Sequence, residues 1–226
     1  MVTSDSVFTC SNPGRGTGRE REKGVLRKYS LANGTLLWEQ ELRYPCTSWP
    51  VVSAKGDTMV VPIGSLPDTP VTMQYFKQGK KFAQKVHQEN VLAGSNARRL
   101  LGLPELRGAL MAFDPHTGEL QWDHEVPAWG GIGAAGDEEG IMERHKLKIR
   151  PICLPAHWSA PTFDGEGTVH LGRIDGSLYA YHPEKGERTY TTGSGALPPG
   201  ISFAPGMMAY ADCDTLYVFR ADKQKH

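Results

Sequence analysis

Three consecutive acids, Asp137, Glu138 and Glu139, have the clearest capacity for chemistry, and they lie in a glycine-rich segment that follows Trp129. Carboxylate oxygens are the ligands that Ca²⁺ prefers, and a calcium site needs about six to eight oxygens. Asp137 and Glu138 are therefore candidates for a metal site. Three adjacent acids in a glycine-rich loop are more often solvated, and no Lys-Ser or Lys-Thr pair follows the glycines to make a phosphate-binding loop.

The cysteines and histidines show no catalytic or metal-binding pattern. No two of the cysteines, Cys10, Cys46, Cys153 and Cys213, have the C-x-x-C spacing of zinc and redox sites. Each occupies or flanks a predicted strand, so we expect free cysteines packed as small hydrophobes, with a disulfide as the alternative. The histidines form no H-x-x-x-H or His-Asp cluster. No catalytic residue is predicted from these types.

A basic segment spans residues 66 to 107 of an otherwise neutral chain, which has 25 Lys and Arg against 25 Asp and Glu. Apolar residues near helical spacing, among them Phe76, Phe82 and Val86, predict a partly helical insertion. The segment predicts a docking surface for an acidic partner or headgroup, and a solvated helical excursion is the alternative. The basic candidates for this interaction are Lys77, Lys80, Lys81, Lys85, Arg98 and Arg99.

The strands expected around these residues follow a repeat. A glycine, a second glycine ten residues later and an aromatic residue fourteen residues later occur in three copies, which are Gly24–Gly34–Trp38, Gly108–Gly118–Trp122 and Gly176–Gly186–Tyr190. The second glycine of each copy marks a turn between two short alternating strands. The aromatic residue is expected to cover the peptide planes around a glycine in the next unit.

A second pattern precedes each of the last two copies and follows the third. It consists of a proline, a short apolar run, a turn with Gly or Asp, and a threonine that opens another strand. The proline and threonine of the three occurrences are Pro50 and Thr58, Pro161 and Thr168, and Pro205 and Thr215. One unit therefore has four strands: proline-led, threonine-led, glycine-led and a strand ending in Trp or Tyr. Four-stranded units in series predict an all-β fold, a β-propeller.

The segment Ala112-Phe-Asp114-Pro-His-Thr117-Gly118-Glu-Leu-Gln-Trp122 resembles the Ala-x-Asp-x-x-Thr-Gly-x-x-x-Trp repeat of the quinoprotein, or PQQ-like, β-propellers. A second match runs from Trp158 to Gly186, and the resemblance covers most of the chain outside about residues 66–107 and 130–150. The family includes quinoprotein alcohol dehydrogenases and non-enzymatic relatives. Members work mostly outside the bacterial cytoplasm, so the resemblance implies an extracytoplasmic or organellar location, although no targeting signal is recognised here.

The resemblance fails where an enzyme of that family needs its chemistry. Gly130 and Gly131 follow Trp129 where a Trp-Asp-like motif is expected to supply an acid, and the vicinal cysteine pair of many such dehydrogenases is absent. A base would have to lie within hydrogen-bond reach of the alcohol beside the bound quinone. The residues thus favour a non-catalytic member of the family, with no cofactor.

Counting strands predicts about three full blades and a partial one across residues 1–226, treated as a single propeller segment. Because closed propellers have about four to eight blades, the chain resembles the C-terminal half of a longer quinoprotein-like propeller. Unpaired blade edges invite association with another protein or a second copy. The neutral charge does not indicate nucleic-acid binding, and no apolar run is long enough to span a membrane.

Two functions from different classes are compatible with these observations. The leading hypothesis is a non-catalytic PQQ-like propeller that acts as a protein-interaction scaffold or accessory subunit of a larger assembly. The alternative is a dehydrogenase that oxidises an alcohol or sugar with PQQ and Ca²⁺, or a fragment of one. Fold alone does not decide between them, because function depends on the site.

Overall fold

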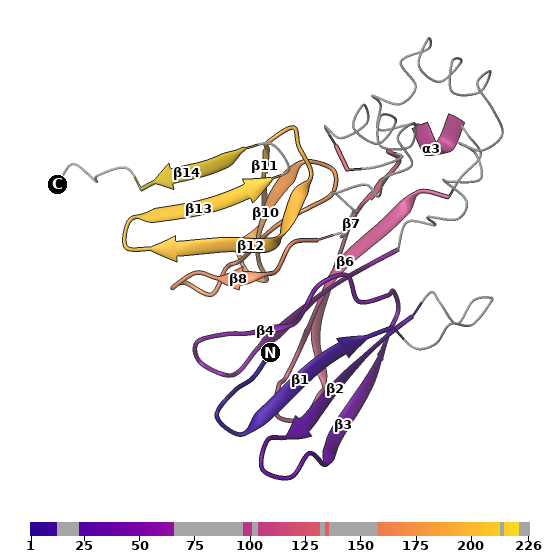
Figure 1. Ribbon diagram of the computed structural model, residues 1–226, viewed down its shortest axis with the longest axis vertical. Helices are drawn as coiled ribbons and strands as arrows, with labels where there is room; N and C mark the ends of the chain where they lie inside the picture. Colours follow the sequence, from indigo (N-terminus) through magenta and orange to yellow (C-terminus); the bar gives the residue numbers. More distant parts are fainter. Residues whose placement is uncertain are drawn as a thin grey trace, which may run out of the picture.

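A computed structural model describes residues 1–12, 23–65, 97–100, 104–131, 134–135, 158–212 and 215–221. These residues are nearly all β, as predicted, and form four antiparallel sheets in which each strand pairs with its neighbours in sequence. The sheets follow one another along the chain, and over the described residues they do not close into a ring (Figure 1). None of the described helices is long and apolar enough to cross a membrane.

The strands have the following bounds. The first sheet contains β1 (Ser6–Ser11), β2 (Gly24–Ser30) and β3 (Leu36–Leu42). The second contains β4 (Val51–Val52), β5 (Met59–Gly64), β6 (Leu106–Phe113) and β7 (Leu120–Trp129). The third contains β8 (Thr162–Phe163), β9 (Val169–Gly172), β10 (Ser177–His182) and β11 (Gly186–Thr191). The fourth contains β12 (Ala196–Ala204), β13 (Met207–Asp212) and β14 (Leu216–Arg220), and the short helix α3 (Ala97–Leu100) lies between β5 and β6.

The predicted four-stranded unit is present in the second and third sheets. Pro50 and Pro161 directly precede the first strand of each, and Thr58 and Thr168 directly precede the second. In the second sheet β5 and β6 are separated in sequence by the basic segment, yet they pair over the full length of β5, from Met59 opposite Phe113 to Gly64 opposite Gly108. The segment therefore interrupts the sequence of the repeat without interrupting its sheet.

The predicted turns form, and the reason for their glycines is visible in the backbone. Gly34, Gly118 and Gly186 have φ angles of 73°, 78° and 78°, in the left-handed region that L side chains rarely adopt. In the second copy Asp114 Oδ1 accepts hydrogen bonds from the backbone N–H groups of His116 (2.6 Å) and Thr117 (3.1 Å). The third copy has His182 at this position, and its Nδ1 accepts from the N–H groups of Glu184 and Lys185. A different side chain thus fulfils the same role.

Two details of the strand prediction are wrong. Trp38 and Trp122 are the third residues of β3 and β7 rather than their last, because these strands continue along the full length of their partners. In the fourth sheet Pro205 lies in the turn between β12 and β13, and three strands are present where two were expected. The strand that was not expected is β12, which contains two consecutive prolines. Prolines are tolerated at sheet edges, and β12 is at the edge of its sheet, with an irregular register.

The core lies between successive sheets. Met59, Val61 and Ile63 of β5 pack toward the first sheet, whereas Val60 packs toward the third. All six residues of β5 are buried. Alternate side chains of a strand point to opposite faces, so burial of every residue means that both faces of the second sheet are covered by its neighbours. Burial of both faces explains why β5 is a continuous apolar run.

The repeat aromatics contact the following sheet at each of the three junctions. A Cβ atom added to Gly118 would lie 2.9 Å from Cδ2 of Trp38, so the indole covers that glycine as predicted. At the next junction Trp122 contacts Tyr181 instead, with ring centroids 4.9 Å apart. Tyr190 contacts Phe219 edge-on at 5.6 Å. The glycine contact is therefore confirmed at the first junction, and aromatic pairs replace it at the other two.

Candidate interaction surfaces

The fourth sheet has an apolar face that no described part of the chain covers. Tyr210, Tyr217 and Phe219 pack toward the third sheet. Side chains at alternate positions of β13 and β14 point the other way, and three large ones are exposed: Met207 (42%), Leu216 (67%) and Val218 (57%). We call this side, with Ala209 opposite Val218 in the register, the free face.

An open strand edge adjoins the free face. Among the described residues β14 pairs only with β13, so its other edge presents backbone N–H and C=O groups without a partner strand. The corresponding position in the second and third sheets is occupied by β7 and β11. The first sheet differs, because Val2 forms a bridge to Val7 and the N–H of Phe8 donates to the carbonyl of Met1 at 2.9 Å. The open edge of β14 is thus less covered than the edge of β1, and the outer edges of β3, β7 and β11 likewise have no partner strand among the described residues.

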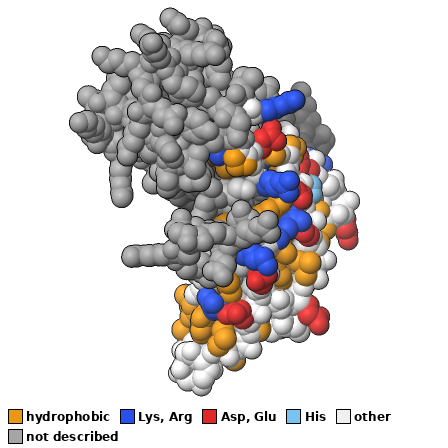
Figure 2. Space-filling view, turned by 90° about the vertical axis from the view of Figure 1, so that its right-hand side faces the viewer, with side chains coloured by type: hydrophobic (Ala, Val, Ile, Leu, Met, Phe, Trp, Pro, Cys, Tyr) orange, Lys and Arg blue, Asp and Glu red, His pale blue; other side chains and the backbone are white. Residues whose placement is uncertain are grey.

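The first and second sheets have a charged surface that is paired within itself. Figure 2 shows basic and acidic side chains alternating down one side of the molecule. Arg27 contacts Glu39 at 2.6 Å within the first sheet, and Arg43 contacts Asp123 at 2.7 Å across to β7. Burial raises the pKa of Asp123, with Arg43 opposing the shift. Because these charges are satisfied locally, this surface has less to offer a partner than the free face.

Most of the sequence-predicted site residues lie outside the described residues. These are Lys77, Lys80, Lys81 and Lys85 of the basic segment and the metal candidates Asp137 and Glu138. Arg99 is exposed, but Arg98 is 1% exposed and its Nε donates to the carbonyl of Pro104 at 2.6 Å. The structure therefore places the Arg98 side chain in a buried local contact, and docking through the basic segment stays a prediction.

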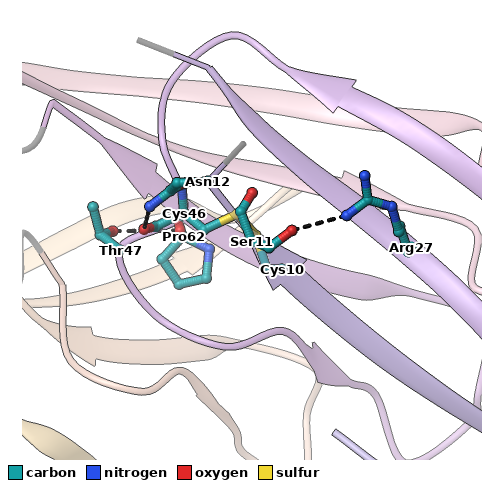
Figure 3. The surroundings of a disulfide bond; sticks show 7 residues. All are labelled: Cys10, Ser11, Asn12, Arg27, Cys46, Thr47 and Pro62. Atoms are coloured by element: carbon teal, nitrogen blue, oxygen red, sulfur yellow. Dashed lines mark hydrogen bonds between the residues drawn. A yellow bond between two sulfur atoms is a disulfide. The ribbon is translucent and has the colours of Figure 1, made fainter. Parts of the chain in front are cut away.

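Cys10 and Cys46 form a disulfide, the alternative in the sequence analysis, with their Cα atoms 5.8 Å apart (Figure 3). Cys10 lies in β1, and Cys46 forms a bridge to Ile63 of β5, so the bond links the first and second sheets. Asn12 adds two hydrogen bonds to the backbone of Cys46, at 2.7 and 3.1 Å. The expectation of two free cysteines at these positions is wrong. The spacing in sequence held no signal, because the two residues meet only when adjacent sheets stack.

A buried arginine, Arg173, lies at the turn between β9 and β10. It is 1% exposed; its Nη1 donates to Asp175 at 2.8 Å, and its guanidinium lies 5.5 Å from the ring centroid of Trp158. The same nitrogen donates to the hydroxyl of Tyr179 at 3.3 Å, and burial raises the pKa of that hydroxyl. The described residues contain no group of three His, Cys, Asp or Glu side chains that could hold a metal ion. The arginine therefore fits a structural role in the third sheet.

Comparison with protein-family models and with curated proteins finds no match for this chain. The resemblance to quinoprotein propellers consequently rests on the repeat residues alone, and functional inference must rest on the free face, the open edge and the other features described above.

Proposed function

We propose that this chain is a PQQ-like β-propeller segment without catalytic activity, which acts as a protein-interaction scaffold or accessory subunit of a larger assembly. The observation that carries the proposal is the free face with its open strand edge. Among the described residues, β5 is buried on both of its faces between the neighbouring sheets, whereas the free face leaves Leu216 and Val218 more than half exposed. Exposed apolar surface of this kind marks interaction sites in proteins.

The partner that fits this surface is another β-sheet. A strand added beside β14 would satisfy its open edge through main-chain hydrogen bonds, and a sheet stacked on the free face would bury its apolar side chains. Such a sheet can come from another polypeptide or from a second copy of this chain. The Cys10–Cys46 disulfide supports a working location in an oxidising compartment, where such bonds persist.

The test is the composition of the native particle, measured by light scattering and native mass spectrometry after mild purification. We expect a particle larger than one chain, and we expect Leu216→Lys combined with Val218→Lys to reduce it, because charges on the free face oppose burial. Leu36→Lys is the matched control, since Leu36 is 51% exposed in the first sheet. A wild-type monomer without partners, or equal loss in the control, would count against the proposal. A bound quinone chromophore would favour the dehydrogenase instead.

A further inference from the structure

Lys28 occupies a position that the other two copies of the repeat fill with alanine. It is the fifth residue of Gly24-Val-Leu-Arg-Lys28, where the other copies have Ala112 and Ala180. The structural equivalence with Ala112 is direct, because Lys28 pairs with Trp38 and Ala112 pairs with Trp122. Both positions are buried, with Lys28 8% exposed. The side chain buries its aliphatic stem and keeps its Nζ in contact with solvent, so the ammonium group is available to a ligand.

The described residues offer few partners to the ammonium group of Lys28. The Nζ of Lys28 lies 5.6 Å from the ring centroid of Phe8, and no described carboxylate lies within salt-bridge distance of it. The charge of Lys28 contributes to lowering the pKa values of Asp5 and Asp114. In both cases hydrogen bonds to the carboxylate are the larger cause. Both carboxylates accept hydrogen bonds within their own turns; Asp5 accepts from the side chains of Ser6 and Thr3. Lys28 therefore keeps unused capacity to bind a negative group.

Lys28 also lines a pocket of about 500 Å³ that is open to solvent. Ser6, Ser30 and Asp5 contribute to the same lining, together with Leu31 and Leu37, which are about half exposed. The volume falls within the range of small-molecule sites, about 300–1,000 Å³. The lining thus combines one positive group, one negative group, hydroxyls and aliphatic surface in a single cavity.

We propose that this cavity binds a small zwitterion of the amino-acid class with an aliphatic side chain. Its carboxylate would pair with Lys28 and accept from the Ser30 hydroxyl, its ammonium group would face Asp5, and its side chain would contact Leu31 and Leu37. A simple anion is disfavoured by Asp5, and a simple cation by Lys28. A zwitterion pairs with both charges, and charge-assisted hydrogen bonds are the strong ones.

The experiment is calorimetric titration of the full chain with L-leucine, and with acetate and methylammonium as probes that carry only one of the two charges. We expect L-leucine to bind at least about tenfold more tightly than either probe. Lys28→Met retains the aliphatic stem and removes the charge, so we expect leucine binding to fall about tenfold or more. The unliganded variant should unfold at about the same denaturant concentration, because methionine keeps the buried aliphatic stem.

Lys23→Met is the matched control, because Lys23 is half exposed and paired with Glu41 of the first sheet; it should leave leucine binding unchanged. Asp5→Asn provides a second variant at an exposed position, where misfolding is not expected, and it should weaken leucine binding while leaving acetate binding equal or stronger. The proposal is overturned if L-leucine does not bind, if acetate binds as tightly as L-leucine, or if the Lys28 and Lys23 variants behave alike.

Discussion

At the scale of single residues, two separate features of the structure favour glycine at position 118. The backbone of Gly118 is in the left-handed region, with a φ of 78°, and the indole of Trp38 leaves no room for a side chain. Gly34 has a similar backbone angle, 73°, but a methyl group added there would meet no atom within 4 Å beyond its chain neighbours. The chain therefore contains a natural control that separates backbone strain from packing.

We expect Gly34→Ala to lower the free energy of unfolding by about 1 kcal/mol, the cost of left-handed backbone for an L residue. Gly118→Ala should lower it by about 1–3 kcal/mol more, because the added methyl group must displace the Trp38 ring. Chemical denaturation of both variants measures the two effects. Equal destabilisation would show that Trp38 yields without cost and that the glycine serves the turn alone.

At the scale of secondary-structure elements, Trp158 connects the third sheet to the second. It is 1% exposed, and its Nε1 donates to the carbonyl of Ile63 in β5 at 3.1 Å. Trp158→Phe keeps an aromatic ring but loses this bond, so we expect a decrease of about 1–3 kcal/mol in the free energy of unfolding. Trp49→Phe is the control, because Trp49 is 56% exposed. Denaturation curves of the two variants should differ clearly, and coincident curves would contradict the role of Trp158.

The disulfide acts at the same scale, since it ties β1 to the segment that enters the second sheet. It closes a loop with a sequence separation of 36 residues. Replacing both Cys10 and Cys46 with serine should lower the free energy of unfolding by about 2–4 kcal/mol, chiefly by freeing the unfolded chain. Wild-type protein in reductant should approach the variant in a denaturant titration. A variant as stable as the oxidised wild type would mean that stacking of the two sheets alone fixes their positions.

At the scale of the whole molecule, we expect the sheets to fold without most of the basic segment, because β5 and β6 pair directly with each other. Deleting residues 70–94 removes Lys77, Lys80, Lys81 and Lys85 while leaving Arg98, whose backbone N–H donates to the carbonyl of Gly130 at 2.7 Å. We expect the free energy of unfolding to change by about 1 kcal/mol or less, because loop length contributes only weakly to stability. Affinity for a copurifying partner should decrease. A full-length variant with the four lysines changed to glutamine separates charge from length, and unchanged affinity in both would refute docking through this segment.

The repeat itself can be recognised in the sequence, for a physical reason. Turn glycines with left-handed backbone, a proline before one strand and a threonine before the next are local requirements, so they recur at fixed offsets wherever the unit recurs. Those offsets predict the strands of the second and third sheets and the turns at Gly34, Gly118 and Gly186. The prediction fails in the fourth sheet. The prolines of β12 argue locally against a strand, and they are tolerated there because β12 is at the edge of its sheet.

An all-β chain of repeated strands follows from the residues alone, since alternation and turn chemistry are local properties. Three features that bear on function do not: the pairing of Cys10 with Cys46, the burial of Arg98 and the place of Lys28 in a cavity lining. Each of them depends on which segments pack together and how closely, and no local pattern encodes that. The exposure of Leu216 and Val218 likewise becomes visible only in the stack of sheets, where no other described sheet covers this face.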